Sequence, residues 1–302
     1  MIHDDSVPRH IPHRDGAGVL SMGLQPLDSR HWIEVDTSLA DFHQHKLFIR
    51  EQHGHGVYDA LPSSLAAQRE LSALLCGHLL EQHEDAYRRD AGGMTCTAGA
   101  FQVALPAGDP EPLWSASLLV ADDLVIMQPS ASGYRLTAAS LASPSHWRLQ
   151  DKLGRPMGEI HDPIPGVHQQ LTPRIDRFFM HITPQRPVCR FNWSLQADPG
   201  LFHPAATHTS VPRGTRLYYR VERQTLRRLP ESGAIVFTIR VFLHPVALLG
   251  AVAGALDALV AAVDATPPAL AQYKGFPVLR DALEQYRLES APDMSRPRRL
   301  ST

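Results

Sequence analysis

The sequence predicts an α+β fold in which a central antiparallel sheet has helices before and after it. Three observations support this prediction. Apolar residues recur at helical spacing in the first third of the 302-residue chain. Short β-rich runs alternate with turn residues in the middle, and the sequence becomes helical again after Pro245. Because neither a repeat nor a low-complexity linker divides the chain, we expect one domain over residues 21–290, between a polar arm (1–20) and a basic tail (291–302).

Two helices are expected in the N-terminal third. The first covers Leu39 to Glu51. The second follows Pro62-Ser63-Ser64, which has the composition of a helix N-terminus. It extends from Leu65 to Arg89, because its leucines recur at roughly helical spacing.

The sheet is expected to begin after residue 92. Turn residues at Asp122-Asp123, Gly133 and Pro230 to Gly233 separate its strands. The expected strands cover residues 114–121, 124–128, 134–141, 188–195, 217–223 and 234–243. Residues 151–174 contain four prolines and three glycines, which predicts a loop. A helical region follows Pro245, and a further helix covers Pro277 to Arg287.

Composition argues against several classes of protein. The net charge of −2 provides no basic field for nucleic acid. The three cysteines, Cys76, Cys96 and Cys189, are too far apart for a zinc motif or a disulfide framework, and free thiols fit a reducing compartment. The N-terminus lacks the apolar core of a secretory signal, and the longest apolar stretch, Val246 to Val263, contains Asp257. We therefore expect a soluble, cytoplasmic protein that binds neither nucleic acid nor membrane.

His161 is the first candidate for chemistry. It lies in the segment Gly158 to Gly166, where Pro163 and Pro165 restrict the backbone that follows it. A stiff segment lowers the entropy cost of presenting one imidazole to a partner. Two readings are open. His161 is either the axial ligand of a haem iron, a role that histidine often fills, or a histidine that hydrogen-bonds to its own loop.

Three neighbours of His161 bear on this choice. His168 lies close in the sequence and is the main rival ligand. Asp162 or Glu159 would orient the ligand through its second ring nitrogen.

Glu222 is the second candidate. In a strand, Arg220 and Glu222 share one face, whereas Arg223 points to the other. A carboxylate in a pocket acts as a base or acid when burial or cationic neighbours tune its pKa. The alternative is a cross-strand ion pair of little net value.

Clustered arginines could neutralise an anionic cofactor such as haem, whose two propionates need cationic partners. Arg240 ends an apolar strand, where a charge costs free energy unless it is paired. Asn192 and Trp193 follow Arg190 and offer an amide and an aromatic wall, although Trp193 also fits a core position. The cluster comprises Arg190, Arg223, Arg227, Arg228 and Arg240, of which Arg228 is expected to be solvated at the surface.

The same segments resemble a family first catalogued as a domain of unknown function and now associated with the α subunit of haem-dependent oxidative N-demethylases. The ordered succession of segments, from about Ser21 to Leu243, carries the resemblance. The segments are Met22–Leu24, Trp32–Asp36, Pro144–Trp147, Lys152–Pro156, Ile160–Gly166, Arg190–Trp193 and Arg220–Arg240.

The resemblance implies a PAS-like sheet that holds a b-type haem in a multi-component monooxygenase. The implied reaction is oxidative N-demethylation of a small secondary amine such as dimethylamine, with release of formaldehyde. The implied partners are an NADPH-dependent reductase with flavin and iron–sulfur centres, and a tetrahydrofolate-binding subunit that takes up the formaldehyde. The chain has no GxGxxG loop and no iron–sulfur cysteine spacing, so a separate reductase is required.

Residue by residue, the resemblance makes His161 the proximal iron ligand. Glu222 would accept a proton from the ammonium form of the substrate. Arg240, or as second choice Arg220, would hydrogen-bond the oxygen held at the iron. The cofactor-binding residues would be His161, His168, Arg190, Asn192, Trp193 and Arg223, with Arg190 and Arg223 on the propionates.

Two other functions are weighed against this one. A haem-binding PAS-like protein can be a gas or redox sensor without turnover, but no kinase or helix-turn-helix output segment is evident in the chain. In the third reading the segments only pack together and no cofactor is bound.

Overall fold

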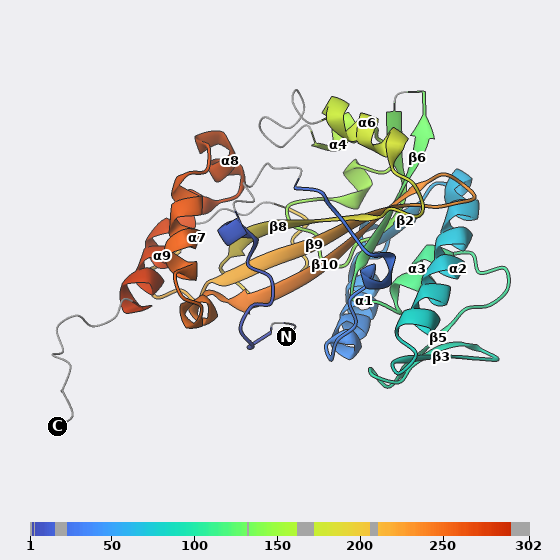
Figure 1. Ribbon diagram of the computed structural model, residues 1–302, viewed down its shortest axis with the longest axis horizontal. Coiled ribbons are helices and arrows are strands. Elements are labelled where there is room, and N and C mark those ends of the chain that lie inside the picture. Colours follow the sequence, from blue (N-terminus) through green and yellow to red (C-terminus); the bar gives the residue numbers. More distant parts are fainter. Residues whose placement is uncertain are drawn as a thin grey trace.

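A computed structural model describes residues 2, 4–15, 23–131, 133–161, 172–205 and 211–290 of the protein. It is an α+β structure built on a large, seven-stranded antiparallel sheet, as the sequence predicts (Figure 1). The order of strands is β1-β8-β9-β10-β6-β7-β2, and a separate three-stranded sheet has the order β3-β4-β5.

The large sheet is centred on a long hairpin. Strands β9 and β10 are joined by a turn in which Gly233 adopts a φ of 67°, a conformation that glycine adopts without strain. The strands of this sheet are β1 (Gln25–Pro26), β2 (Tyr58–Ala60), β6 (Asp123–Ser130), β7 (Gly133–Ser140), β8 (Val188–Gln196), β9 (Tyr218–Arg228) and β10 (Ile235–Pro245). Those of the small sheet are β3 (Tyr87–Asp90), β4 (Gly93–Cys96) and β5 (Phe101–Ala104).

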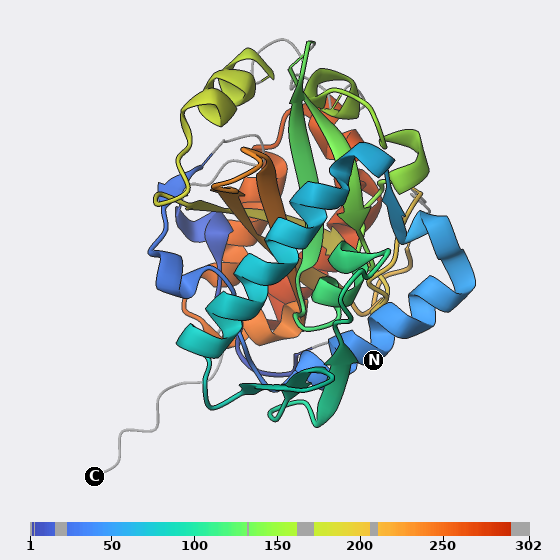
Figure 2. The ribbon, with the colours of Figure 1, turned by 90° about the vertical axis from the view of Figure 1, so that its right-hand side faces the viewer.

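Helices cover the large sheet in three groups. Helices α1 to α3 lie at one end, α7 to α9 at the other, and α4 and α6 lie together near one edge (Figure 1); Figure 2 shows α2 crossing the sheet. The helices are α1 (Leu39–His53), α2 (Leu65–Gln82), α3 (Pro112–Ser117), α4 (Met157–His161), α6 (Thr172–His181), α7 (Ala255–Asp264), α8 (Pro268–Tyr273) and α9 (Phe276–Ser290). Short 3₁₀ turns occur at Pro12–Asp15, Ser29–His31, Gly54–Gly56, Pro62–Ser64, Leu149–Asp151 and Val246–Ala251.

Each helix group packs against the sheet and forms its own apolar core with it. Leu71 and Leu75 of α2 pack under the sheet with Trp32. Leu259 of α7 and Leu283 of α9 pack at the opposite end. A third core, around α4 and α6, faces the other side of the hairpin and includes Met127, Met157 and Phe179. This third core borders the cavity described below.

Two predicted elements in the first half of the chain were wrong in type or length. The expected strand at 114–121 overlaps helix α3, whose Pro112 occupies the first helical turn. The apolar run that follows is buried, and periodicity alone does not distinguish a buried helix from a buried strand. The expected helix 65–89 ends at Gln82, and Tyr87 then pairs with Cys96 in the small sheet.

The predicted loop 151–174 is in part helical. Helix α4 follows Pro156 directly, and Pro173 lies in the first turn of α6. Proline is tolerated there because the first N–H groups of a helix have no intrahelical partner. His161 is therefore the last residue of a short helix and not a loop residue.

No helix in the described ranges is long and apolar enough to span a membrane.

Candidate functional site

A cavity of about 430 Å³ lies between the large sheet, the α4–α6 pair and the corner that joins α8 to α9. This volume is typical of small-molecule and cofactor sites. One part of its wall is apolar and comes from both the sheet and the two helices. These apolar residues include Val125, Met127, Leu136, Met157, Ile160, Ile175, Phe178, Phe179, Leu226, Phe237 and Ile239.

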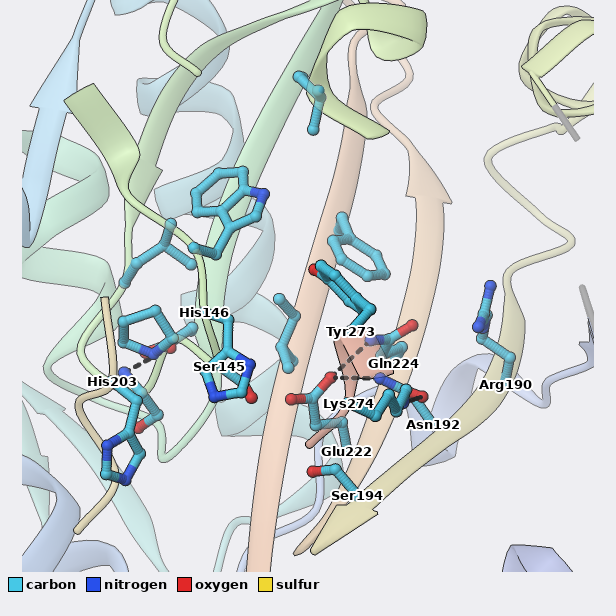
Figure 3. A pocket seen from close by; sticks show the side chains of 18 of the residues that line it. Ser145, His146, Arg190, Asn192, Ser194, His203, Glu222, Gln224, Tyr273 and Lys274 are labelled. Carbon is cyan, nitrogen blue, oxygen red and sulfur yellow. Dashed lines mark hydrogen bonds between the residues drawn. The ribbon is translucent and has the colours of Figure 1, made fainter. Parts of the chain in front are cut away.

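Glu222 marks the polar end of the cavity. Its Oε2 accepts hydrogen bonds from Asn192 Nδ2 at 3.1 Å and from Gln224 Nε2 at 2.9 Å. Its Oε1 accepts from Arg220 Nε at 3.1 Å. Figure 3 shows Glu222 on the same side as Asn192 and Gln224, with Ser145 and His146 across from it. Strand register explains this grouping, because Asn192 and Glu222 are direct cross-strand partners.

The surroundings of Glu222 keep it ionised. Burial alone would raise the pKa of its carboxyl group, but the charge of Arg220, the hydrogen bond from Asn192 and the charge of Lys274 outweigh that effect. The pKa of Glu222 therefore lies below its usual value of 4.5. At neutral pH the cavity holds a fixed negative charge beside an apolar wall.

Arg220 lies behind the cavity rather than in its wall. Its side chain is fully buried, and besides Glu222 it donates to the Ser143 carbonyl and, at 3.4 Å, to the Leu201 carbonyl. These bonds tie the carboxylate to two loops that border the cavity. Arg220 is thus placed to position Glu222.

The loop from Ser143 to Trp147 forms the opposite wall and was not predicted to carry site residues. Asp123 anchors it by accepting from the Ala142 and Ser143 backbone N–H groups at 2.9 and 2.8 Å. His146 adopts a φ of 56°, and its N–H donates to the His203 carbonyl at 2.7 Å. Such a left-handed non-glycine residue persists where neighbours hold it, and is often found at functional sites.

The corner between α8 and α9 supplies two more residues that sequence reasoning missed. Lys274 Nζ donates to Asn192 Oδ1 at 3.0 Å, and Tyr273 also lines the cavity. Burial raises the pKa of Tyr273, and the charge of Glu222 raises it further. Because Lys274 lies far from the strand motifs in the sequence, no pattern indicated that it belongs to the site.

Arg190 lines the cavity on strand β8, next to Asn192 in the same row of side chains. Its Nε atom is buried and has no hydrogen-bond partner within the described residues. Burial lowers the pKa of its guanidinium, an effect that the charge of Glu222 partly offsets. A half-buried guanidinium with unused hydrogen-bonding capacity suits an anionic group such as a carboxylate.

Arg223 and Arg240 lie on the face of the sheet opposite the cavity. They are direct cross-strand partners, so their side chains share that face. Arg223 Nε pairs with Glu34 Oε1 at 2.9 Å, and Arg240 Nη2 pairs with Asp36 Oδ2 at 2.9 Å. Both arginines therefore hold the segment that follows Trp32 against the sheet, and neither lines the cavity.

Trp193 also lies on that opposite face. Its ring stacks on Phe276, with 5.5 Å between ring centroids, in the core formed with α7 and α9. Of the other arginines, Arg227 lies over the Trp32 ring at 4.7 Å. Arg228 is half-buried and donates to the Ile182 and Phe179 carbonyls near the end of α6, so it is not a freely solvated residue.

Replacing Arg240 by methionine is expected to destabilise the fold by about 2–3 kcal/mol, because it removes a buried guanidinium that donates a charge-assisted hydrogen bond to the half-buried Asp36. Urea unfolding measures this free energy. Arg30→Met, which removes an exposed pair with Asp28, is the matched control and should cost at most about 1 kcal/mol. A stable Arg240→Met protein that has lost activity would instead return Arg240 to a catalytic role.

His161 ends helix α4, and the structure gives its backbone position. Met157 and Ile160 of the same helix line the cavity. Glu159 forms an exposed ion pair with Arg155 at 2.9 Å. The other candidates in this region, Asp162 and His168, lie outside the described residues.

Comparison with known protein families gives one match that spans most of the chain. The family of the haem-dependent oxidative N-demethylase, alpha subunit-like proteins matches residues 23–284. The protein belongs to this family. Its name indicates dependence on haem and a place in a complex of several subunits.

The cavity fits the haem that this family requires. Its apolar wall suits the faces of a macrocycle, and the unpartnered Nε of Arg190 suits a propionate. Among the described residues, no group of three or more histidine, cysteine, aspartate or glutamate side chains is arranged to hold a metal ion. A haem needs no such group, because the macrocycle surrounds the iron and the protein adds an axial ligand.

Proposed function

We propose that this protein is the haem-carrying subunit of a monooxygenase that removes a methyl group from a small secondary amine such as dimethylamine and releases formaldehyde. The Glu222 carboxylate, held by three side-chain donors at one end of a largely apolar cavity, is the observation that carries this proposal. A small alkylammonium ion needs one anionic partner and apolar walls around its methyl groups. Family membership supplies the haem.

His161 is the proposed iron ligand. It follows Met157 by four residues in α4, and positions four apart lie on one face of a helix. Because Met157 and Ile160 line the cavity, this spacing supports a position for residue 161 at the same wall. Arg190 would hold a propionate. We also infer that the sheet is PAS-like and that residues 21–290 form one domain.

When bound, the haem supplies the activation of dioxygen. The residues of this chain bind the amine, orient it and take up its proton. Glu222 binds the substrate ammonium, orients one methyl group toward the apolar end and accepts the ammonium proton transiently on its way to solvent, so that the neutral amine reacts. Arg220, Asn192 and Gln224 hold the carboxylate still for this purpose.

The stoichiometry of the proposed reaction determines which partner proteins it requires. One oxygen atom of O₂ ends in formaldehyde and the other in water, so two protons and two electrons must be delivered from outside. The sequence contains no flavin or nicotinamide fingerprint. We therefore propose a separate NADPH-dependent flavin and iron–sulfur reductase, and a tetrahydrofolate-binding subunit that takes up the formaldehyde.

A formaldehyde assay tests this function without the unknown reductase. Hydrogen peroxide supplies both an oxygen atom and the two electrons, so purified haem-loaded protein with dimethylamine and peroxide should release formaldehyde and methylamine in equal amounts. Reactions without amine and with heat-denatured protein are the controls. A haem-loaded protein that yields no formaldehyde from any alkylamine, with peroxide or with a reductase, would favour the sensor function.

The pH dependence of amine binding follows from the lowered pKa of Glu222. A carboxyl group with a lowered pKa is ionised throughout the neutral range and becomes protonated only on strong acidification. Calorimetric titration with dimethylammonium chloride should therefore give a constant affinity between about pH 6 and 7.5, with a loss only below the usual glutamate pKa of 4.5. An affinity that falls tenfold between pH 7 and pH 6 would contradict this assignment.

A further inference from the structure

Lys274 contacts the site from outside the sheet. It lies at the corner between α8 and α9, and its Nζ donates to Asn192 Oδ1 at 3.0 Å and to the Trp193 carbonyl at 2.8 Å. Figure 3 shows Lys274 beside Asn192 and Glu222. The C-terminal helices thus reach the polar end of the cavity through an ammonium group.

The two ends of the Asn192 amide are chemically different. An ammonium group only donates hydrogen bonds, so the amide oxygen must face Lys274. The NH₂ end then faces Glu222, where Nδ2 donates to Oε2 at 3.1 Å. The reverse orientation would set two NH groups against each other and turn an oxygen toward a carboxylate. Lys274 therefore favours the same orientation of the amide that the Glu222 carboxylate requires.

We propose that Lys274 is a positioning residue that fixes the Asn192 amide in the orientation that donates to Glu222, and so keeps this carboxylate ionised for the amine. The inference rests on the proposed function for the part that concerns the amine. The contacts between Lys274, Asn192 and Glu222 stand without it.

Other charged and polar groups also act on the pKa of Glu222, so the experiment must separate their effects from that of Lys274. Arg220, on the same strand as Glu222, forms an ion pair with it. The charge of Glu222 also acts to raise the pKa of Arg190 on β8 and of Tyr273 beside Lys274. The opposite wall contributes Asp123, His146 and His203. Burial lowers the pKa of Lys274 to about 8, although Glu222 acts to raise it, so Lys274 is largely charged at neutral pH.

Infrared titration of Glu222 tests the proposal on the purified haem-loaded chain. The band of its protonated carboxyl group is the one that Glu222→Gln removes. In Lys274→Met we expect the pKa of Glu222 to rise by about one unit, a tenfold change in its ionisation constant. Lys274→Arg keeps a cationic donor and should restore most of the shift. An unchanged Glu222 titration in folded Lys274→Met would overturn the proposal.

A double-mutant cycle separates action through Asn192 from the mere charge of Lys274. If Lys274 acts through the amide, Lys274→Met made in an Asn192→Ala background should shift the pKa of Glu222 by less than half as much as in the native background. A shift of half or more would mean that Lys274 acts on Glu222 directly, and the positioning role would be rejected.

Two further measurements complete the test. Arg280→Met removes a cation from the same helical layer, where it pairs with Asp264 and Glu284, and should leave the Glu222 titration unchanged. If Lys274→Met does not fold, Asn192→Leu must raise the pKa of Glu222 by a similar amount, and an unchanged value again overturns the proposal. Dimethylammonium binding to the native protein is measured separately, so that failure of the amine function and failure of the Lys274 role are distinguishable.

Discussion

Replacement of His161 by alanine is expected to strip the protein of its haem. Loss of an axial ligand should weaken haem binding on the order of 100-fold, at least as much as loss of a supporting residue around a metal site. The ratio of haem to protein after purification, together with the Soret absorption, measures the effect. Added free imidazole should restore haem binding in part, because it replaces the missing side chain at the iron.

His168→Ala is the matched control for this experiment, since His168 is the rival ligand near the same segment. It should keep its haem and its spectrum. If His161→Ala retains haem with an unchanged spectrum while His168→Ala loses it, the ligand is His168, and the argument from the helical spacing of α4 fails.

Replacement of Glu222 by glutamine is expected to keep the haem and abolish most of the demethylation. Glutamine has nearly the same shape, but it carries no charge to bind an ammonium and is no proton acceptor at neutral pH. Its NH₂ group would also face the donors of Asn192, Gln224 or Arg220. Loss of a positioned general base typically costs about 10²–10⁴-fold in rate. Formaldehyde release per haem measures this loss.

Glu111→Gln serves as the control for Glu222→Gln, because Glu111 pairs with Arg50 at 2.9 Å and does not line the cavity. Its activity per haem should equal that of the native protein. Full activity of Glu222→Gln at neutral pH would reject Glu222 as the amine-binding carboxylate.

Local sequence patterns predicted the sheet better than the helices. The hairpin of β9 and β10 has β-rich strands and a turn with proline and glycine, and both features are visible without a structure. Helix α3 was missed because its apolar residues are buried, so no polar face revealed its period. Helix α4 was missed because the prolines on either side of it, Pro156 and Pro163, are equally typical of a loop.

The candidate site was predicted in part, and strand geometry explains where the prediction stopped. Alternation along β9 placed Glu222 and Arg223 on opposite faces, and the structure has them so. The face of Arg240 depends on the register of β10 against β9, which pairs it with Arg223. Sequence position alone does not give that register. Arg240, a charge in an apolar strand, was therefore assigned to the oxygen held at the haem iron, although it pairs with Asp36.

Long-range contacts account for the remaining residues. Lys274 is 52 positions from Glu222 in the printed sequence. The loop that carries His146 lies far before Glu222 in the sequence, and it also lines the cavity. The residue types of neither segment indicated a role in the site. Only the packing of α8 and α9 against β8 brings Lys274 to Asn192.

An absorption spectrum of the purified chain tests the central claim, that this cavity holds a haem, most directly. The account predicts a Soret band, a b-type haem in the pyridine haemochrome assay, and about one haem per chain after reconstitution. A folded protein with no Soret band, even after incubation with excess haem, would contradict it.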